Sequence, residues 1–242
     1  MTSDNDAKPI LSYRSAYGFY AIALLVLIVV SLLPTYFPLM VSDPEALAPE
    51  IRIHGAVFFA WYIFFTIQVG LKGARRLALH KLLGALSIPL VAYLVYEGAL
   101  VLWGVMASYD PAWSEAFLRG RVSFVWAIIH TLVSFATFYG LAILYRKNGA
   151  AHRRLMLLAA LSMVSASVTR FAYVSFVPID GTALTLILTY VFFLVPVLVE
   201  FVQRRRVHPA LVWGTILYLV TQLLAMGLMP STALGRALAF PV

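Results

Sequence analysis

The chain has 242 residues, of which 62% are hydrophobic and only 12% are charged. A soluble domain carries about 25% charged residues, so the composition excludes a soluble protein and predicts an integral membrane protein. There is no cysteine, which excludes disulfides, Cys-ligated zinc, iron–sulfur clusters and a thiol nucleophile. The net charge of +8 comes from Lys and Arg beside apolar stretches, which is a topology signal, and no nucleic-acid partner is expected.

Residues 1–16 are too polar and acidic to begin a signal peptide, and no clear cleavage site follows the first apolar stretch. We expect them to form a cytoplasmic tail, and residues 17–242 to form a single transmembrane domain in contact with the lipid bilayer. A spanning helix needs about 20 apolar residues, and seven stretches have this character: 17–40, 54–72, 82–106, 121–144, 154–177, 182–203 and 209–228. The predicted fold is therefore all-α, a polytopic membrane bundle of seven transmembrane helices.

The loops between these stretches alternate in charge. Basic residues gather at 72–81, 146–154 and 204–206, whereas the other loops are acidic or mixed. Basic loops stay in the cytoplasm, so we expect the N-terminus in the cytoplasm, the C-terminus in the periplasm and a location in the bacterial inner membrane.

Polar side chains recur inside the predicted helices, where an ionisable group costs about 2.5–3.5 kcal/mol on insertion scales. Five of them are predicted at nearly one depth, about 4–8 Å to the periplasmic side of the midplane: Glu97, His130, Arg170, Thr189 and Gln222. Tyr93 lies one turn before Glu97 and is expected to line the same region. This set predicts either a structural ion pair with a hydrogen-bonded histidine or a pocket for a polar ligand, a proton or a metal.

A second set of candidates is formed by histidines. Each of His80, His152 and His208 follows a basic loop and starts an outward-running helix, so the three share the cytoplasmic face. Neutral imidazole ligates metals and haem iron, and His54 on the second helix joins them as a candidate ligand for haem b or a divalent metal. The chain has no close His-x₃-His spacing, and a histidine at a helix start also serves simply to anchor that helix.

Three strings, "HGAVFFAWYIFFTIQVGL…LHKLLGALS", "AHRRLMLLAALSMVSASVTRF" and "RRRVHPALVWG", resemble a family of uncharacterised bacterial seven-helix inner-membrane proteins. The shared pattern covers residues 54 to 222, and no activity comes with it. The resemblance carries over the following positions: His54, Trp61, Gln68, His80, Gly84, His152, Arg154, Met156, Arg170, His208, Pro209 and Gly214.

Three functions stay open from the sequence. The first is a ligand- or cofactor-binding membrane protein, the second a small-solute or proton-coupled transporter that uses Glu97, His130 and Arg170, and the third an accessory subunit of a larger membrane complex. All four lysines lie outside the spans or at their edges, which argues against a retinal Schiff base. No Walker loop, Gly-x-Ser-x-Gly or His-Glu-x-x-His motif is present, so the sequence predicts neither an enzymatic reaction nor its absence.

Overall fold

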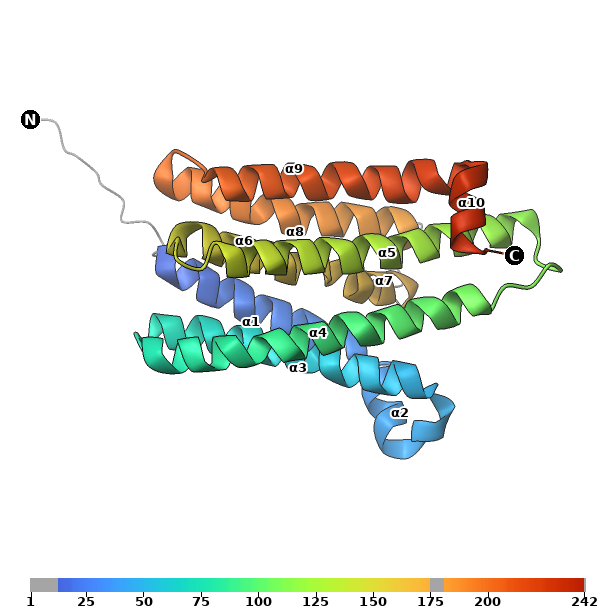
Figure 1. Cartoon of the computed structure of the whole chain (residues 1–242), viewed down its shortest axis with the longest axis horizontal. Coiled ribbons are helices and arrows are strands. Elements are labelled where there is room, and N and C mark those ends of the chain that lie inside the picture. The colour runs from blue at the N-terminus through green and yellow to red at the C-terminus, as the bar shows by residue number, and fades with distance from the viewer. Residues whose placement is uncertain (1–12, 175–180, 242) are drawn as a thin grey trace, which may run out of the picture.

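The computed structural model describes residues 13–174 and 181–241, and every regular element within them is a helix (Figure 1). The α-helices are α1 (Tyr13–Leu32), α2 (Tyr36–Ser42), α3 (Pro49–Gly73), α4 (Leu77–Ala107), α5 (Glu115–Leu144), α6 (Gly149–Ser162), α7 (Val164–Val174), α8 (Gly181–Arg204), α9 (Pro209–Leu223) and α10 (Ala233–Ala239). Short 3₁₀ turns lie at Pro44–Ala46 and Met229–Ser231, and a π-helical turn at Leu224–Leu228 follows α9.

Among the described residues, five helices are long and apolar enough to cross a membrane: α3, α4, α5, α8, and α9 with the turns that continue it to Ser231. The pair α1 and α2 makes a sixth candidate if it is one span, bent by 55° between Leu32 and Tyr36. Their outer faces carry many exposed large apolar side chains, such as Phe19, Leu86 and Trp213, as a surface in contact with lipid requires. The fold is that of a multi-pass, all-helical membrane protein.

The predicted count of seven spans is not confirmed. Its fifth stretch, 154–177, falls on α6 and α7, which are separated at Met163, and its last residues lie outside the described ranges. Neither helix is a spanning candidate on its own, because α6 is only 14 residues long and α7 only 11. At about 1.5 Å per residue, α6 covers about two thirds and α7 about half of a hydrocarbon core that is about 30 Å thick.

Helix α6 lies at the centre of the bundle, packed against α5, α8 and α9. Its residues from Leu157 to Ser162 are all buried, which is typical of a helix enclosed on every side. Where the helix breaks, two buried tyrosines from neighbouring helices approach its backbone. The hydroxyl of Tyr62 on α3 donates to the carbonyl of Ala160 at 2.7 Å, and that of Tyr218 on α9 donates to the carbonyl of Ser162 at 3.4 Å. The break is therefore stabilised from both sides.

The three basic connections lie at one end of the bundle, together with the start of α1 (left in Figure 1). We call this the basic end. Two of its helices stop in an unusual way: Arg75 follows α3 with φ of 59°, and Arg205 follows α8 with φ of 54°. The left-handed conformation just after a helix is normally taken by glycine, so the chain places a cation where the backbone favours a residue without a side chain.

Candidate functional site

One group of ionisable side chains gathers among α3, α4 and α7. The imidazole of His54 lies close enough to both Arg170 and Glu97 for their charges to act on it. Glu97 is only 3% exposed, and Tyr93, one turn before it on α4, is close enough for its hydroxyl to interact with the carboxylate. The structure thus brings together three of the predicted residues and adds His54, which the sequence suggested only as a metal or haem ligand.

Several polar atoms in this part of the bundle have no hydrogen-bond partner in the protein. They include Oε2 of Glu97 and Nδ1 of His54, both buried. A buried polar atom without a partner costs about 1–3 kcal/mol, and such atoms usually mark a bound water, ion or ligand. The group is therefore suited to hold a small polar molecule or a proton.

A second pair of buried polar side chains lies between α8 and α9. The rings of Phe193 and Tyr218 stack at 3.9 Å between centroids, which fixes the register of these antiparallel helices. Thr189 precedes Phe193 by one turn and Gln222 follows Tyr218 by one turn, so the two lie at one level. Oγ1 of Thr189 and Oε1 of Gln222 are both buried without a protein partner.

His130 makes its described contacts between α5 and α9. Its Nε2 lies 2.9 Å from the hydroxyl of Thr221 and 3.3 Å from that of Ser134, and its ring packs against Tyr218 at 4.7 Å. These contacts tie α5 to α9 and account for the side chain as a packing residue. The predicted grouping of His130 with Glu97 and Arg170 receives no support from them.

The histidines of the basic end join helices to their neighbours. With its amide turned to satisfy both partners, Gln68 on α3 donates to Nδ1 of His80 at 2.6 Å and accepts from the backbone N–H of Gly84 at 2.7 Å. Nδ1 of His152 on α6 donates to the carbonyl of Ala142 on α5 at 2.8 Å. The rings of His80 and His152 meet edge to face, 6.4 Å apart. Each therefore fixes the start of its helix.

His208 caps the helix that follows it, α9. Its Nδ1 accepts from the backbone N–H of Ala210 at 3.1 Å and so caps α9. Burial lowers the pKa of His208 from its ordinary value, the cations Arg154, Arg153 and Arg204 lower it further, and only Glu200 opposes them. The imidazole is therefore held in its neutral form, with Nδ1 as the acceptor.

Within residues 13–174 and 181–241, no three His, Asp or Glu side chains lie close enough together to hold a metal ion. The prediction of a haem or metal site on His54, His80, His152 and His208 thus gains no support from the geometry. The structure places His54 apart from the others, in the group with Glu97, and assigns Nδ1 of His152 and of His208 to backbone hydrogen bonds.

One buried ion pair was not predicted from the sequence. Arg154 on α6 and Glu200 on α8 form a buried ion pair with two hydrogen bonds, one of them from Nε to Oε2 at 2.9 Å. One signal for it was present: opposite charges near the basic ends of two predicted spans. Arg154 was read there as part of a basic loop.

These features define a multi-pass membrane protein with polar groups inside its helical bundle. Comparison of the chain with protein families, with curated proteins and with solved structures finds no match. The motif resemblance described above accordingly stays a prediction.

Proposed function

We propose that this protein binds a small polar ligand inside the membrane, in the group formed by His54, Glu97 and Arg170. One observation carries the proposal: Glu97 is only 3% exposed with its Oε2 unpartnered, and the imidazole of His54, whose Nδ1 is also unpartnered, lies within range of the charges of both Glu97 and Arg170. Ionisable groups inside a membrane bundle mark ligand or ion pathways as a rule.

The charges of the group indicate what kind of ligand it takes. A carboxylate and a guanidinium nearly balance each other, so neither a simple anion nor a simple cation is favoured over the other. A small molecule with both a donor and an acceptor, such as a zwitterion or a neutral hydroxylated solute, satisfies Oε2 of Glu97 and Nδ1 of His54 together. The proposed bacterial inner-membrane location, with the basic end in the cytoplasm, would place this group in the periplasmic half of the membrane.

A second candidate is a proton-coupled transporter. The observation that favours it is the interruption of helices near the polar groups: α6 and α7 are separated at Met163, and a π-helical turn starts at Leu224, two residues after Gln222. Discontinuous helices build substrate and ion sites in many transporters. In this candidate Glu97 and His54 exchange the proton and the break beside α7 supplies movement.

The test uses protein purified in a mild detergent, with small molecules extracted and identified by mass spectrometry. We expect a polar compound in the wild type that is lost in Glu97→Gln and in Arg170→Gln, and that raises the unfolding temperature of the wild type alone when it is added back. Glu115→Gln, which changes an exposed carboxylate at the start of α5, is the matched control and retains the compound.

If wild type and Glu97→Gln release the same compounds and unfold at the same temperature throughout a panel of amino acids, carboxylates and polyols, the proposal is wrong. Uptake into vesicles that depends on a pH gradient and on Glu97 would support the transporter function instead. A visible spectrum with a Soret band, metal in the purified sample, or a stoichiometric co-purifying subunit selects the cofactor-binding or accessory-subunit functions.

A further inference from the structure

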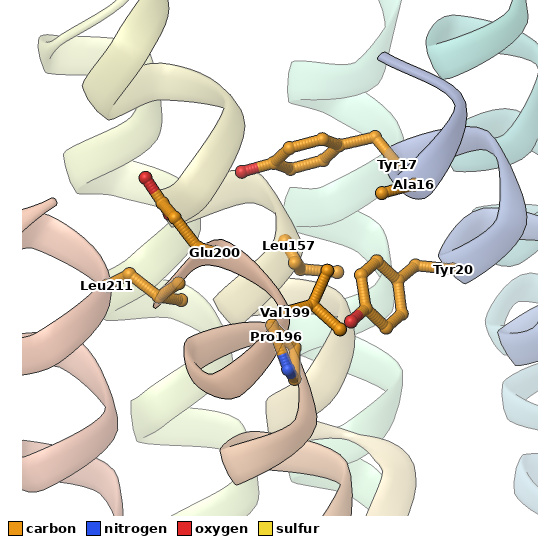
Figure 2. A pocket seen from close by; sticks show the side chains of 8 residues that line it. All are labelled: Ala16, Tyr17, Tyr20, Leu157, Pro196, Val199, Glu200 and Leu211. Atoms are coloured by element: carbon orange, nitrogen blue, oxygen red, sulfur yellow. The ribbon is translucent and has the colours of Figure 1, made fainter. Parts of the chain in front are cut away.

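Two contacts fix how the residues of α8 and α9 face each other. The rings of Phe193 and Tyr218 stack across the interface of these antiparallel helices. Seven residues later on α8 and seven earlier on α9, Glu200 and Leu211 line the same small pocket, as Figure 2 shows. Seven residues make about two helical turns, so both contacts lie on one face of each helix and give a single register for the interface.

This register places Thr189 of α8 opposite Gln222 of α9, one turn beyond the ring stack. The two side chains are only 0% and 1% exposed. Oγ1 of Thr189 and Oε1 of Gln222 are both buried, and neither has a hydrogen-bond partner among the described residues. Two polar atoms therefore face one interface from opposite sides without bonding to each other.

The free hydroxyl of Thr189 departs from the behaviour of other helical threonines in this protein. A threonine inside a helix can donate its proton to the backbone carbonyl four residues earlier, and this bond is made by Thr66, Thr169, Thr185 and Thr221. The hydroxyl of Thr189 makes no such bond. It is therefore turned away from its own backbone, with its proton and its lone pairs both available to another group.

A single water molecule meets the needs of the two atoms. Oε1 of Gln222 only accepts a hydrogen bond, whereas the hydroxyl of Thr189 both donates and accepts. Lipid offers neither of them a partner, and buried waters typically bond to polar groups that the protein leaves unsatisfied. Neither side chain is charged, and hard cations collect about six oxygen ligands, so the pair suits water rather than a metal ion.

Helix α9 is also irregular at this level. Thr221, next to Gln222, lies 2.9 Å from Nε2 of His130 on α5. The π-helical turn at Leu224–Leu228 starts two residues after Gln222, and such turns are frequent at functional sites. At this level α9 thus makes a polar contact with α5 on one side and presents a further polar atom to α8 on the other.

We propose that an ordered water molecule binds between Thr189 and Gln222 and joins α8 to α9 inside the membrane. The water donates to Oε1 of Gln222 and accepts the proton of Thr189. Neither residue belongs to the group around Glu97, so the site is independent of the ligand proposed there.

The first measurement is the unfolding temperature of the detergent-purified full chain in Thr189→Val, in Gln222→Met and in the double variant. If a water bridges the two side chains, each single substitution lowers the unfolding temperature. The double variant then falls no further than the worse single variant, because both ends of the bridge are removed together. If the two atoms have no partner at all, each single substitution instead raises the unfolding temperature, since the cost of an unsatisfied buried group is lifted. That result, or losses that add up in the double variant, overturns the proposal.

Thr66→Val is the matched control for this cycle. Thr66 lies on α3 and donates to the carbonyl of Tyr62 in its own helix at 2.8 Å. Its effect should add to that of Gln222→Met, because the two residues share no partner. Coupling of the same size in this pair would mean that the cycle does not report on a bridge.

The second measurement detects the water itself. Hydroxyl radicals formed from bound water by X-ray radiolysis oxidise the side chains beside it, and mass spectrometry locates the label. Phe193 and Tyr218 are both 0% exposed and lie one turn from the proposed site, so bulk solvent does not reach them. The labelling is done in Thr215→Val, which removes another unpartnered hydroxyl from this face of α9.

We expect both rings to be labelled in Thr215→Val and the label to be lost when Thr189→Val and Gln222→Met are added. Tyr62, which is also 0% exposed, should be unchanged between the two proteins. Rings that stay unlabelled in Thr215→Val, or label that survives the added substitutions, would show that no water is held between Thr189 and Gln222.

Discussion

Arg154 and Glu200, 46 residues apart in the sequence, form a two-point ion pair in which the side chains are only 1% and 5% exposed. The pair joins the central helix α6 to α8 at the basic end. When one charge of such a buried pair is removed, the other stays buried without a counter-charge, and this is strongly destabilising.

We therefore expect Glu200→Gln to lower the free energy of unfolding by about 3–5 kcal/mol, because the guanidinium of Arg154 stays buried without its counter-charge. Arg154→Met with Glu200→Met removes both charges and should restore most of that loss. Unfolding in a denaturing detergent measures both variants.

The exposed pair of Glu45 and Arg52, 2.8 Å apart with Glu45 84% exposed, provides the control. Glu45→Gln should cost about 0–1 kcal/mol. Equal effects of the two single substitutions would contradict a special contribution from the buried pair.

The broken central helix gives a second prediction. Tyr62→Phe and Tyr218→Phe each remove a hydroxyl that donates to a carbonyl at the break, at Ala160 and at Ser162. Each variant should lose about 1–3 kcal/mol of stability, because a buried carbonyl is left unsatisfied. The shorter bond of Tyr62 should make its loss the larger of the two. Amide hydrogen exchange around Met163 should rise in both, and unchanged exchange there would show that the break needs no such support.

The third prediction concerns pH. The pKa of His208 lies below its ordinary value because of burial and of the cations on α6 and α8, with Glu200 opposing. As pH falls through about 6.5, the unfolded chain binds a proton that the folded protein does not. Stability should therefore fall with pH from that point down to the lowered pKa, and be independent of this group at higher pH.

His208→Asn is the informative variant, because asparagine caps helices well and does not titrate. It should keep α9 stable and flatten the pH dependence between about 6.5 and the lowered pKa of His208. His208→Ala also removes the cap and should cost about 1 kcal/mol at every pH. A steep pH dependence in His208→Asn would assign the titration to another group.

The fourth prediction concerns the two arginines with positive φ. Arg205→Gly should raise the free energy of unfolding by about 1 kcal/mol, because glycine adopts the left-handed conformation without strain. Arg75→Gly should act in the same direction. Thermal unfolding in detergent measures the gain, with Arg205→Ala as the control that removes the charge and keeps the strain. A loss of stability in Arg205→Gly would mean that the arginine side chain holds the helix end.

The sequence predicted the helical class and most helix positions correctly, because a membrane imposes long apolar stretches that stand out in any sequence. It also predicted that His80, His152 and His208 share one end, since loop charge alternates with each crossing. The sequence did not reveal the break at Met163. The tyrosines that hydrogen-bond to the backbone beside the break, Tyr62 and Tyr218, are distant from it in the sequence, so no local pattern indicates it.

Depth alone likewise could not show which polar residues meet. Glu97 and His130 were placed at one level, but lateral position depends on helix rotation and on which helices are neighbours. The structure pairs Glu97 with His54 from the adjoining helix α3, whereas His130 faces Thr221 on α9.

The position of Arg154 on a short central helix also constrains how the protein is made. Helix α6 leaves the ribosome before α8, so its guanidinium has no carboxylate partner until Glu200 has been synthesised. We therefore expect α6 to become stable in the bundle only once α8 is present. For this central helix, the order of integration is expected to differ from the order of synthesis.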